Sequence, residues 1–314
     1  MHYLDEINKK LLNFVKKKKK YIIYGQNIDT GTFISGLTKN FDKLNNNLIF
    51  NTPNCEYSLI GAGLGVMFDG GNVIYFGKQL DFILLGVDHF VNSINFLKNK
   101  LNKKKIGSYT IVLYVCDQGY QGPQSSFNNI DDLSSLAQID TFQINTYFDV
   151  NTVIPYVFKK KGFNIISISQ RNSKNIIFSE KPDSYSENMS FVKYFKGQDV
   201  VIISTNFSFQ QALEIKESLK NNEKVSIINC NFLTELSYNF LIKNVRKSKK
   251  VLLISDGKSI NHRIFKLESF IKSHASCAIK TKLLYREDFT WNIQLDKLEF
   301  GKSQLSEIKK FCEN

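Results

Sequence analysis

The feature that most constrains the fold of this chain is a regular alternation of short apolar runs with amphipathic segments. The runs at residues 73–76, 108–115 and 164–169 are short and rich in β-branched and aromatic residues, which is typical of buried strands. Between them, residues 81–98 and 150–160 carry apolar residues at helical spacing. Strands that alternate with helices predict an α/β fold with a parallel, doubly wound sheet.

The same pattern begins again in the second half of the chain. Strand-like runs and helical segments alternate there once more, with strands expected at 199–204, 225–229 and 251–255. A polar stretch at 181–188, which contains Pro182 and several serines, separates the two halves and is typical of a linker. We therefore expect two doubly wound α/β domains, at residues 1–188 and 189–314, of which the second is the smaller.

Composition narrows the class of protein. No run of about 18 apolar residues occurs, so the sequence predicts no membrane span and no membrane partner. Residues 1–13 are charged and lack the apolar block of a secretory signal. The five cysteines are scattered without Cys-x-x-Cys spacing, which favours free thiols and a cytoplasmic location over a disulfide framework or a zinc site.

The net charge of +13 has two interpretations. It suits acidic partners such as phosphorylated ligands or nucleic acid. It also suits a coding bias, because Lys, Asn, Ile and Phe are abundant together. The densest basic cluster is at residues 16–20, directly before an expected strand at 21–24. We interpret it as the solvated end of a helix. Since no aromatic-interleaved motif accompanies it, no nucleic-acid partner is expected.

Several short motifs follow one another along the chain. Residues 51–56 read Asn-Thr-Pro-Asn-Cys-Glu and lead into Leu-Ile-Gly-Ala-Gly-Leu-Gly at 59–65. Further motifs lie at 81–92, 176–182 and 197–203. Their order and spacing resemble the beta subunits of 2-oxo acid dehydrogenases and, more distantly, transketolases. The resemblance covers nearly the whole chain and implies a pyrimidine-binding domain followed by a transketolase-like C-terminal domain.

The resemblance implies thiamine diphosphate with Mg²⁺ as the cofactor, and it places the family's glutamate at Glu56. In that role the carboxylate hydrogen-bonds N1′ of the aminopyrimidine and favours the imino tautomer, whose 4′-nitrogen removes the proton from thiazolium C2. The alternative is an ordinary glutamate at the start of a helix, where its charge favours the helix dipole. The resemblance also places the ring that stacks on the aminopyrimidine at Phe82, with Ile60 lining the same pocket. The alternative for Phe82 is a core phenylalanine.

The family's Gly-Asp-Gly motif, which binds the diphosphate through Mg²⁺, is absent from the sequence. The pairs Asp69-Gly70 and Asp256-Gly257 are interpreted as turns at strand edges. The resemblance therefore implies an alpha-type partner subunit that holds the metal and the diphosphate, with no metal ligand on this chain. It also implies an active site at the subunit interface and an α₂β₂ assembly.

Two departures from the family pattern concern the substrate. Gln26 aligns with a carboxylate of a family Gly-Glu-Asp segment, and an amide cannot exchange protons at neutral pH. The loop at 119–126 resembles the one that carries a substrate-facing histidine, and that position falls on Ser125. None of the four histidines lies in this loop, and a hydroxyl cannot replace a histidine as an acid near pH 7. Substrate contacts are expected from Gln26, Gln124, Ser125 and Ser126.

Three functions remain open from the sequence. The first is a beta subunit of a 2-oxo acid dehydrogenase-like enzyme, which decarboxylates a 2-oxo acid and passes the acyl group to a lipoyl acyltransferase. The second is a split transketolase-like enzyme that moves a two-carbon unit onto a sugar or a sugar nucleotide. The third is a catalytically retired structural subunit, favoured by the missing histidine and opposed by the retention of Glu56.

Overall fold

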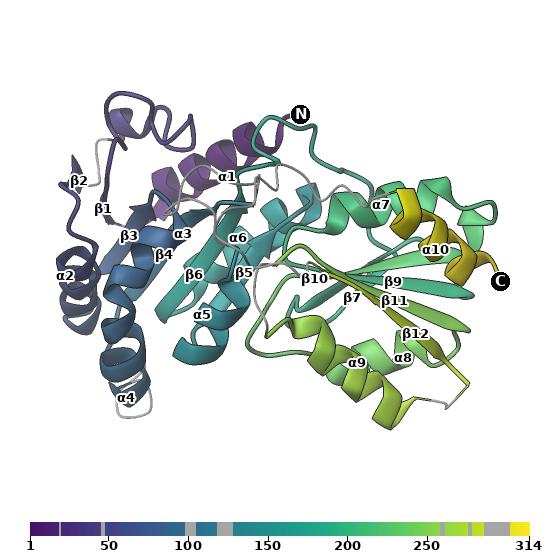
Figure 1. Cartoon of the computed structure of the whole chain (residues 1–314). Coiled ribbons are helices and arrows are strands. Elements are labelled where there is room, and N and C mark those ends of the chain that lie inside the picture. Colours follow the sequence, from purple (N-terminus) through teal and green to yellow (C-terminus); the bar gives the residue numbers. More distant parts are fainter. Residues whose placement is uncertain are drawn as a thin grey trace. The chain divides into compact units, whose positions relative to one another are not determined.

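The computed structural model describes residues 1–18, 20–44, 48–97, 105–117, 128–257, 261–275, 278–285 and 302–314. The contacts between residues divide the chain into two compact units, each built on one sheet (Figure 1). The first unit comprises Met1–Cys116 and Leu133–Ser179, and the second comprises Asn128–Asp132 and Glu180–Asn314. Each unit is described separately.

The sheet of the first unit has six strands, all parallel, in the order β2-β1-β3-β4-β6-β5. Their bounds are β1 Ile22–Gly25, β2 Leu48–Asn51, β3 Asn72–Gly77, β4 Ser108–Val115, β5 Asp140–Ile144 and β6 Gly162–Ser169. Strand β4 is buried at every position, because helices cover both faces of the sheet. This burial is why the strands read as continuous apolar runs in the sequence.

Helices lie on both faces of this sheet. On one face α1, Tyr3–Lys18, packs against α6, Tyr147–Lys159, which begins with a capping box between Thr146 and Asp149. On the other face α2, Glu56–Phe68, and α3, Leu80–Ile83, contact strands β3 and β4. The short helices α4, Asn95–Leu97, and α5, Ile130–Ala137, follow the same connections. Right-handed crossovers account for this division, because the chain moves one way through α2 to α5 and back through α6.

The single helix expected at residues 81–98 is instead a series of short helical turns. After α3 come a 3₁₀ turn at Leu84–Gly86, a π-helical segment at His89–Ile94, and then α4. A separate 3₁₀ turn at Phe41–Lys43 lies between β1 and β2. The close packing of Gly86 gives a physical reason for the interruption of the helix. A β-carbon at this position would lie 2.3 Å from Ile60 Cδ1. The local geometry is therefore adapted to the approach of α2.

The sheet of the second unit is also six-stranded, in the order β12-β11-β9-β10-β8-β7. Strands β9 to β12 are parallel to one another and form the α/β core, while β8 and β7 add an antiparallel edge. The bounds are β7 Ser184–Tyr185, β8 Phe191–Tyr194, β9 Val200–Thr205, β10 Val225–Cys230, β11 Lys250–Ser255 and β12 Lys280–Leu284.

Two layers of helices cover this second sheet. Figure 1 shows α7, Phe209–Ser218, with α10, Lys302–Glu313, on one face, and α8, Tyr238–Val245, with α9, Arg263–His274, on the other. A 3₁₀ turn at Asn222–Lys224 leads into β10. Among the described residues, no helix is long and apolar enough to cross a membrane.

The predicted fold class is confirmed, since both units are α/β with parallel-dominated sheets. Residues 56–68, which contain the Gly-Ala-Gly-Leu-Gly motif, form α2. The domain borders at 1–188 and 189–314 remain a prediction, and by contacts Asn128–Asp132 and the residues from Glu180 onward belong to the second unit.

Candidate active site

The path of the chain through the first sheet marks a place where ligands bind in such folds. From β1 the chain goes to β2 on one side and then crosses to β3 on the other side of β1. In doubly wound sheets, ligands bind beyond the carboxyl ends of the strands at such a reversal. Gln26, Glu56 and Phe82 lie in the segments that follow the carboxyl ends of β1, β2 and β3, respectively. Three of the predicted site residues therefore share one edge of the sheet.

Glu56 is a buried carboxylate at the first position of α2, with only 5% of its surface exposed. The residue before it, Cys55, makes no side-chain cap to the helix. The helix dipole places partial positive charge at this end, which stabilises a carboxylate there. A buried carboxylate requires hydrogen-bond donors, so its partners decide what it can do.

Gln26 supplies one of these donors. Its Nε2 donates to Glu56 Oε1 across 3.1 Å, although the two residues are 30 positions apart. Within the described part of the chain, the Glu56 carboxylate accepts no other hydrogen bond, so Oε2 is left without a donor. The carboxylate thus has one oxygen fixed by the protein and one available for a ligand.

The turn that carries Gln26 is held by Asn51 at the end of β2. Asn51 Oδ1 accepts a hydrogen bond from the backbone N–H of Ile28 at 2.7 Å. Asn51 Nδ2 donates to Thr30 Oγ1 at 2.9 Å and also to the Asp29 carboxylate. The backbone N–H of Thr52 donates to Gly25 O at 3.0 Å. These bonds couple the two segments that bring Gln26 and Glu56 together.

A cluster of three tyrosines lies beneath the first turns of α2. The Tyr24 hydroxyl donates to Leu59 O at 2.6 Å and lies 3.2 Å from the Tyr109 hydroxyl. The rings of Tyr24 and Tyr75 stack with centroids 5.1 Å apart. Burial raises the pKa of all three phenols well above the ordinary value, and the Glu56 carboxylate adds to the rise for Tyr75. The phenols therefore stay protonated and hold α2 in place.

Phe82 and Ile60 lie on neighbouring elements. Ile60 is one helical turn after Glu56, is fully buried and packs against Gly86. Phe82 is half-buried on α3, which contacts α2. Its ring makes no aromatic contact with another described residue. The structure thus places Phe82 near α2 with part of its ring accessible, while Ile60 is a packing residue behind the start of the helix.

The outer face of α2 is apolar and exposed. Tyr57 is 52% exposed, and Ala62 and Gly65 also face outward. Tyr57 lies against His89, with ring centroids 4.3 Å apart, and His89 occupies the space that a side chain at Gly61 would need. His89 is thus a packing residue at the edge of this face.

The remaining predicted residues differ in how far the structure describes them. Gln124, Ser125 and Ser126 lie outside the described residues. Asp69-Gly70 forms the turn between α2 and β3, with Gly70 at φ +87°, as expected. Asp256 follows β11 and accepts a hydrogen bond from the backbone N–H of Phe207 at 2.8 Å. Asn51 and the three tyrosines were not predicted, because in the sequence they resemble ordinary strand residues.

Comparison with solved structures supports the fold. No protein-family model matches the chain. Among solved structures, it is similar to one described as a split gene transketolase, inactive beta4 tetramer, with a TM-score of 0.72. The identity is 14%, and the match covers 98% of this chain and 97% of that one. The chain therefore has a transketolase-like two-domain α/β fold.

Proposed function

We propose that this chain is the beta-type subunit of a thiamine diphosphate-dependent enzyme and that Glu56 activates the cofactor. The observation that carries the proposal is the environment of Glu56. Its carboxylate is buried at the start of α2, beyond the carboxyl ends of the strands, with Oε1 held by Gln26 and Oε2 without a donor. The transketolase-like fold and the order of the sequence motifs support it.

The residues of this chain fit the aminopyrimidine half of the cofactor. Thiamine diphosphate, when bound, supplies a thiazolium that serves as carbon nucleophile and electron sink. Glu56 Oε2 would hold a proton shared with N1′ of the aminopyrimidine, and the Gln26 amide would keep the carboxylate oriented. Phe82 would stack its accessible ring on the aminopyrimidine. Ile60 would support this pocket from behind α2.

Binding of the diphosphate half of thiamine diphosphate would require a second chain. This sequence contains no Gly-Asp-Gly motif, so an alpha-type subunit would hold Mg²⁺ and the diphosphate. The exposed apolar face of α2, around Tyr57, Ala62 and Gly65, is a surface that such a subunit would cover. We propose an α₂β₂ assembly with the active site between the two kinds of chain.

Two reactions fit this assignment. In the first, a 2-oxo acid is decarboxylated and its acyl group passes to a lipoyl acyltransferase. In the second, a two-carbon unit passes to a sugar or a sugar nucleotide. The name of the similar solved structure favours the second. So do Gln26 and Ser125, which stand where the dehydrogenase pattern has a carboxylate and a histidine.

Cofactor binding tests the assignment directly. Calorimetry with thiamine diphosphate and Mg²⁺ is made on this chain alone and on the chain co-expressed with its alpha-type partner. We expect binding only to the complex. Tight binding to the single chain would show that it holds the diphosphate itself, and no binding to either sample would leave a structural subunit.

The role of Glu56 is tested in the assembled complex. Because a positioned acid–base group contributes about 10² to 10⁴ in rate, Glu56→Gln is expected to lower kcat by at least about 100-fold. Glu180→Gln, at an exposed position, serves as the control and is expected to leave kcat unchanged. Full activity of the Glu56→Gln complex would contradict the proposed role of Glu56 in cofactor activation. A screen of 2-oxo acids against ketose donors then separates the two reactions.

A further inference from the structure

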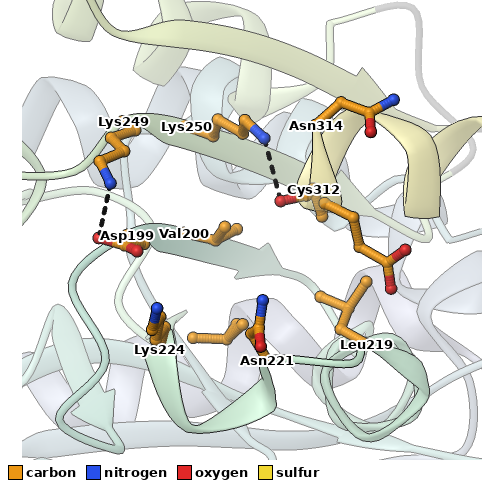
Figure 2. A pocket seen from close by; sticks show the side chains of 11 residues that line it. Asp199, Val200, Leu219, Asn221, Lys224, Lys249, Lys250, Cys312 and Asn314 are labelled. Atoms are coloured by element: carbon orange, nitrogen blue, oxygen red, sulfur yellow. Dashed lines mark hydrogen bonds and ion pairs between the residues drawn. The ribbon is translucent and has the colours of Figure 1, made fainter.

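A cavity lies in the second unit, at the amino ends of its parallel strands. It is formed where β9, β10 and β11 begin side by side, with the turn after α7 and the end of α10 as its other walls (Figure 2). Its volume is about 190 Å³. The candidate active site belongs to the first unit, so the cavity is a separate feature.

The backbone around this cavity is cross-linked. Asp199 N donates to Lys224 O at 3.1 Å, and Asp199 O accepts from the backbone N–H groups of Lys249 and Lys250, at 3.0 and 3.2 Å. These bonds tie the starts of the three strands to one another. These bonds fix the backbone at the strand starts. A ligand therefore need not order this backbone when it binds, which favours binding.

Lysines dominate the charged part of the lining. Lys224 and Asn221 point into the cavity from one side, and Lys249 and Lys250 lie at the other (Figure 2). Lys250 Nζ donates to Cys312 O at 3.0 Å, which uses one of its three N–H groups. No carboxylate of the described residues forms an ion pair with Lys224 or Lys250. Two cations therefore face the cavity without a compensating anion.

The two carboxylates in the lining are already engaged. Asp199 Oδ1 lies 3.5 Å from Lys249 Nζ, in a pair whose side chains are 40% and 75% exposed. Such an exposed pair is weak and opens readily. Glu313 Oε1 accepts from the backbone N–H of Lys220 at 3.1 Å. Lys224 and Lys250 therefore have no ion-pair partner among the described residues, and these two side chains favour an anion as ligand.

The volume of the cavity and its apolar wall restrict the class of ligand that can bind there. Pockets for drug-sized molecules begin near roughly 300 Å³, so a nucleotide is too large for this cavity. Val200, Leu219 and Val225 form an apolar wall. Burial raises the pKa of Cys312 to about 11, so its thiol is neutral and adds no competing charge. We propose that this cavity binds inorganic phosphate or a small phosphomonoester, with Lys224, Lys249 and Lys250 as its cationic donors.

The test is calorimetric titration of the full chain with sodium phosphate and, separately, with glycerol 3-phosphate, at ionic strength held constant with sodium chloride. Wild type is compared with Lys224→Gln and Lys266→Gln. Both lysines are exposed, so each change removes one surface charge, and Lys266 is on α9 outside the cavity lining. We expect affinity to fall about tenfold in Lys224→Gln, the size of a lost charge-assisted hydrogen bond, and to stay within about twofold in Lys266→Gln.

The outcomes separate the sources of the anion. Tighter binding of glycerol 3-phosphate than of phosphate would identify a phosphomonoester as the ligand, because only the ester reaches the apolar wall. Equal binding would identify the phosphate ion. Absence of binding to wild type, or an equal loss in both variants, would overturn the proposal. The experiment needs neither the partner subunit nor thiamine diphosphate, so its result is independent of the proposed function.

Discussion

Gln26 donates its amide N–H to Glu56 Oε1 at 3.1 Å, so an amide fixes the carboxylate proposed to activate the cofactor. A carboxylate at position 26 would face Glu56 at the same distance and repel it. Two carboxylates that close share a proton, because both cannot be ionised without a large cost. The amide at position 26 therefore gives the Glu56 carboxylate a hydrogen-bond donor in place of a second carboxylate.

This relationship predicts the behaviour of Gln26→Glu. The shared proton would raise the pKa of the pair in the folded state above the unfolded value of about 4.3 for glutamate. A group with a raised folded pKa contributes stability at low pH and loses it as pH rises, so the variant should fall below wild type above about pH 4 to 5. Urea unfolding of both proteins from pH 4 to 8 measures this difference.

The control for that prediction is Gln26→Met, which keeps the size of the side chain and removes the donor. It leaves Glu56 Oε1 buried without a partner, which costs about 1–3 kcal/mol. This cost should be present throughout the neutral range, with a smaller dependence on pH than the one expected for Gln26→Glu. Parallel profiles for the two variants would contradict the shared proton.

The close packing of α2 on the tyrosine cluster predicts opposite effects at two glycines of one helix. A β-carbon at Gly63 would lie 2.4 Å from Tyr109 Cζ and 2.5 Å from the Tyr24 hydroxyl. Gly63→Ala should therefore destabilise the chain by about 1–3 kcal/mol through overpacking. At Gly65 nothing lies within 4 Å of the added β-carbon, so Gly65→Ala should stabilise the helix by about 0.5–1 kcal/mol.

Urea unfolding of the single chain measures both changes. The two variants carry the same chemical change two residues apart, so a difference in sign reports packing and not helix propensity. Equal effects at Gly63 and Gly65 would show that α2 does not lie against Tyr24 and Tyr109 in solution.

Tyr75 predicts a loss of stability in alkali. Burial, and then the nearby Glu56 carboxylate, raise its pKa above the ordinary value of 10. Above pH 10 the unfolded chain releases this proton while the folded chain keeps it, so the free energy of unfolding falls as pH rises. One such group contributes up to about 1.4 kcal/mol per pH unit. Tyr75→Phe should make the fall between pH 10 and 11 less steep, by about 1 kcal/mol over that unit.

Tyr185→Phe is the control for this prediction, because Tyr185 is 50% exposed and loses the same hydroxyl. Its unfolding profile should follow that of wild type. If Tyr75→Phe and wild type fall equally steeply, the Tyr75 hydroxyl is not protected from ionisation in the folded protein.

The sequence was most informative where local pattern determines structure. Alternating apolar runs predicted β1, β3, β4, β6, β9, β10 and β11, but not β2, β7, β8 and β12, which are short or lie at a sheet edge. Glu56 is the first residue of α2, the position that one of its two interpretations gave it. Burial of both sheet faces is what makes the strands recognisable. The broken helix after residue 80 was not predictable, because its form depends on the contact of Gly86 with Ile60, a long-range packing event.

The site itself was only partly predictable. Gln26 and Glu56 are 30 residues apart and meet because β1 and β2 are parallel neighbours in register, with Gly25 opposite Asn51. The spacing of residues along the chain does not encode that register. Asn51, which holds the turn after β1, was likewise missed, since its role depends on contacts with Ile28 and Thr30.

The second unit contains a buried ion pair. We expect a large loss of stability when either of its two residues is replaced alone. Arg263 Nε lies 3.2 Å from Asp131 Oδ1, and the two side chains are 10% and 3% exposed. Asp131 Oδ2 also accepts from the backbone N–H of Arg263 at 3.1 Å and from Asn206 Nδ2 at 3.4 Å. Removing one member of a buried pair leaves the other charge without compensation, which costs about 3–5 kcal/mol.

A double-mutant cycle measures this coupling. Asp131→Asn and Arg263→Gln should each destabilise the chain by about 3–5 kcal/mol, and the double variant should lose much less than the sum, because neither buried charge remains. Lys249→Gln with Asp199→Asn is the matched control, since that exposed pair should show a coupling of about 0.2–1 kcal/mol. Additive losses at Asp131 and Arg263 would mean that solvent screens the pair, and the segment at 128–132 would then not be held to the second unit by this contact.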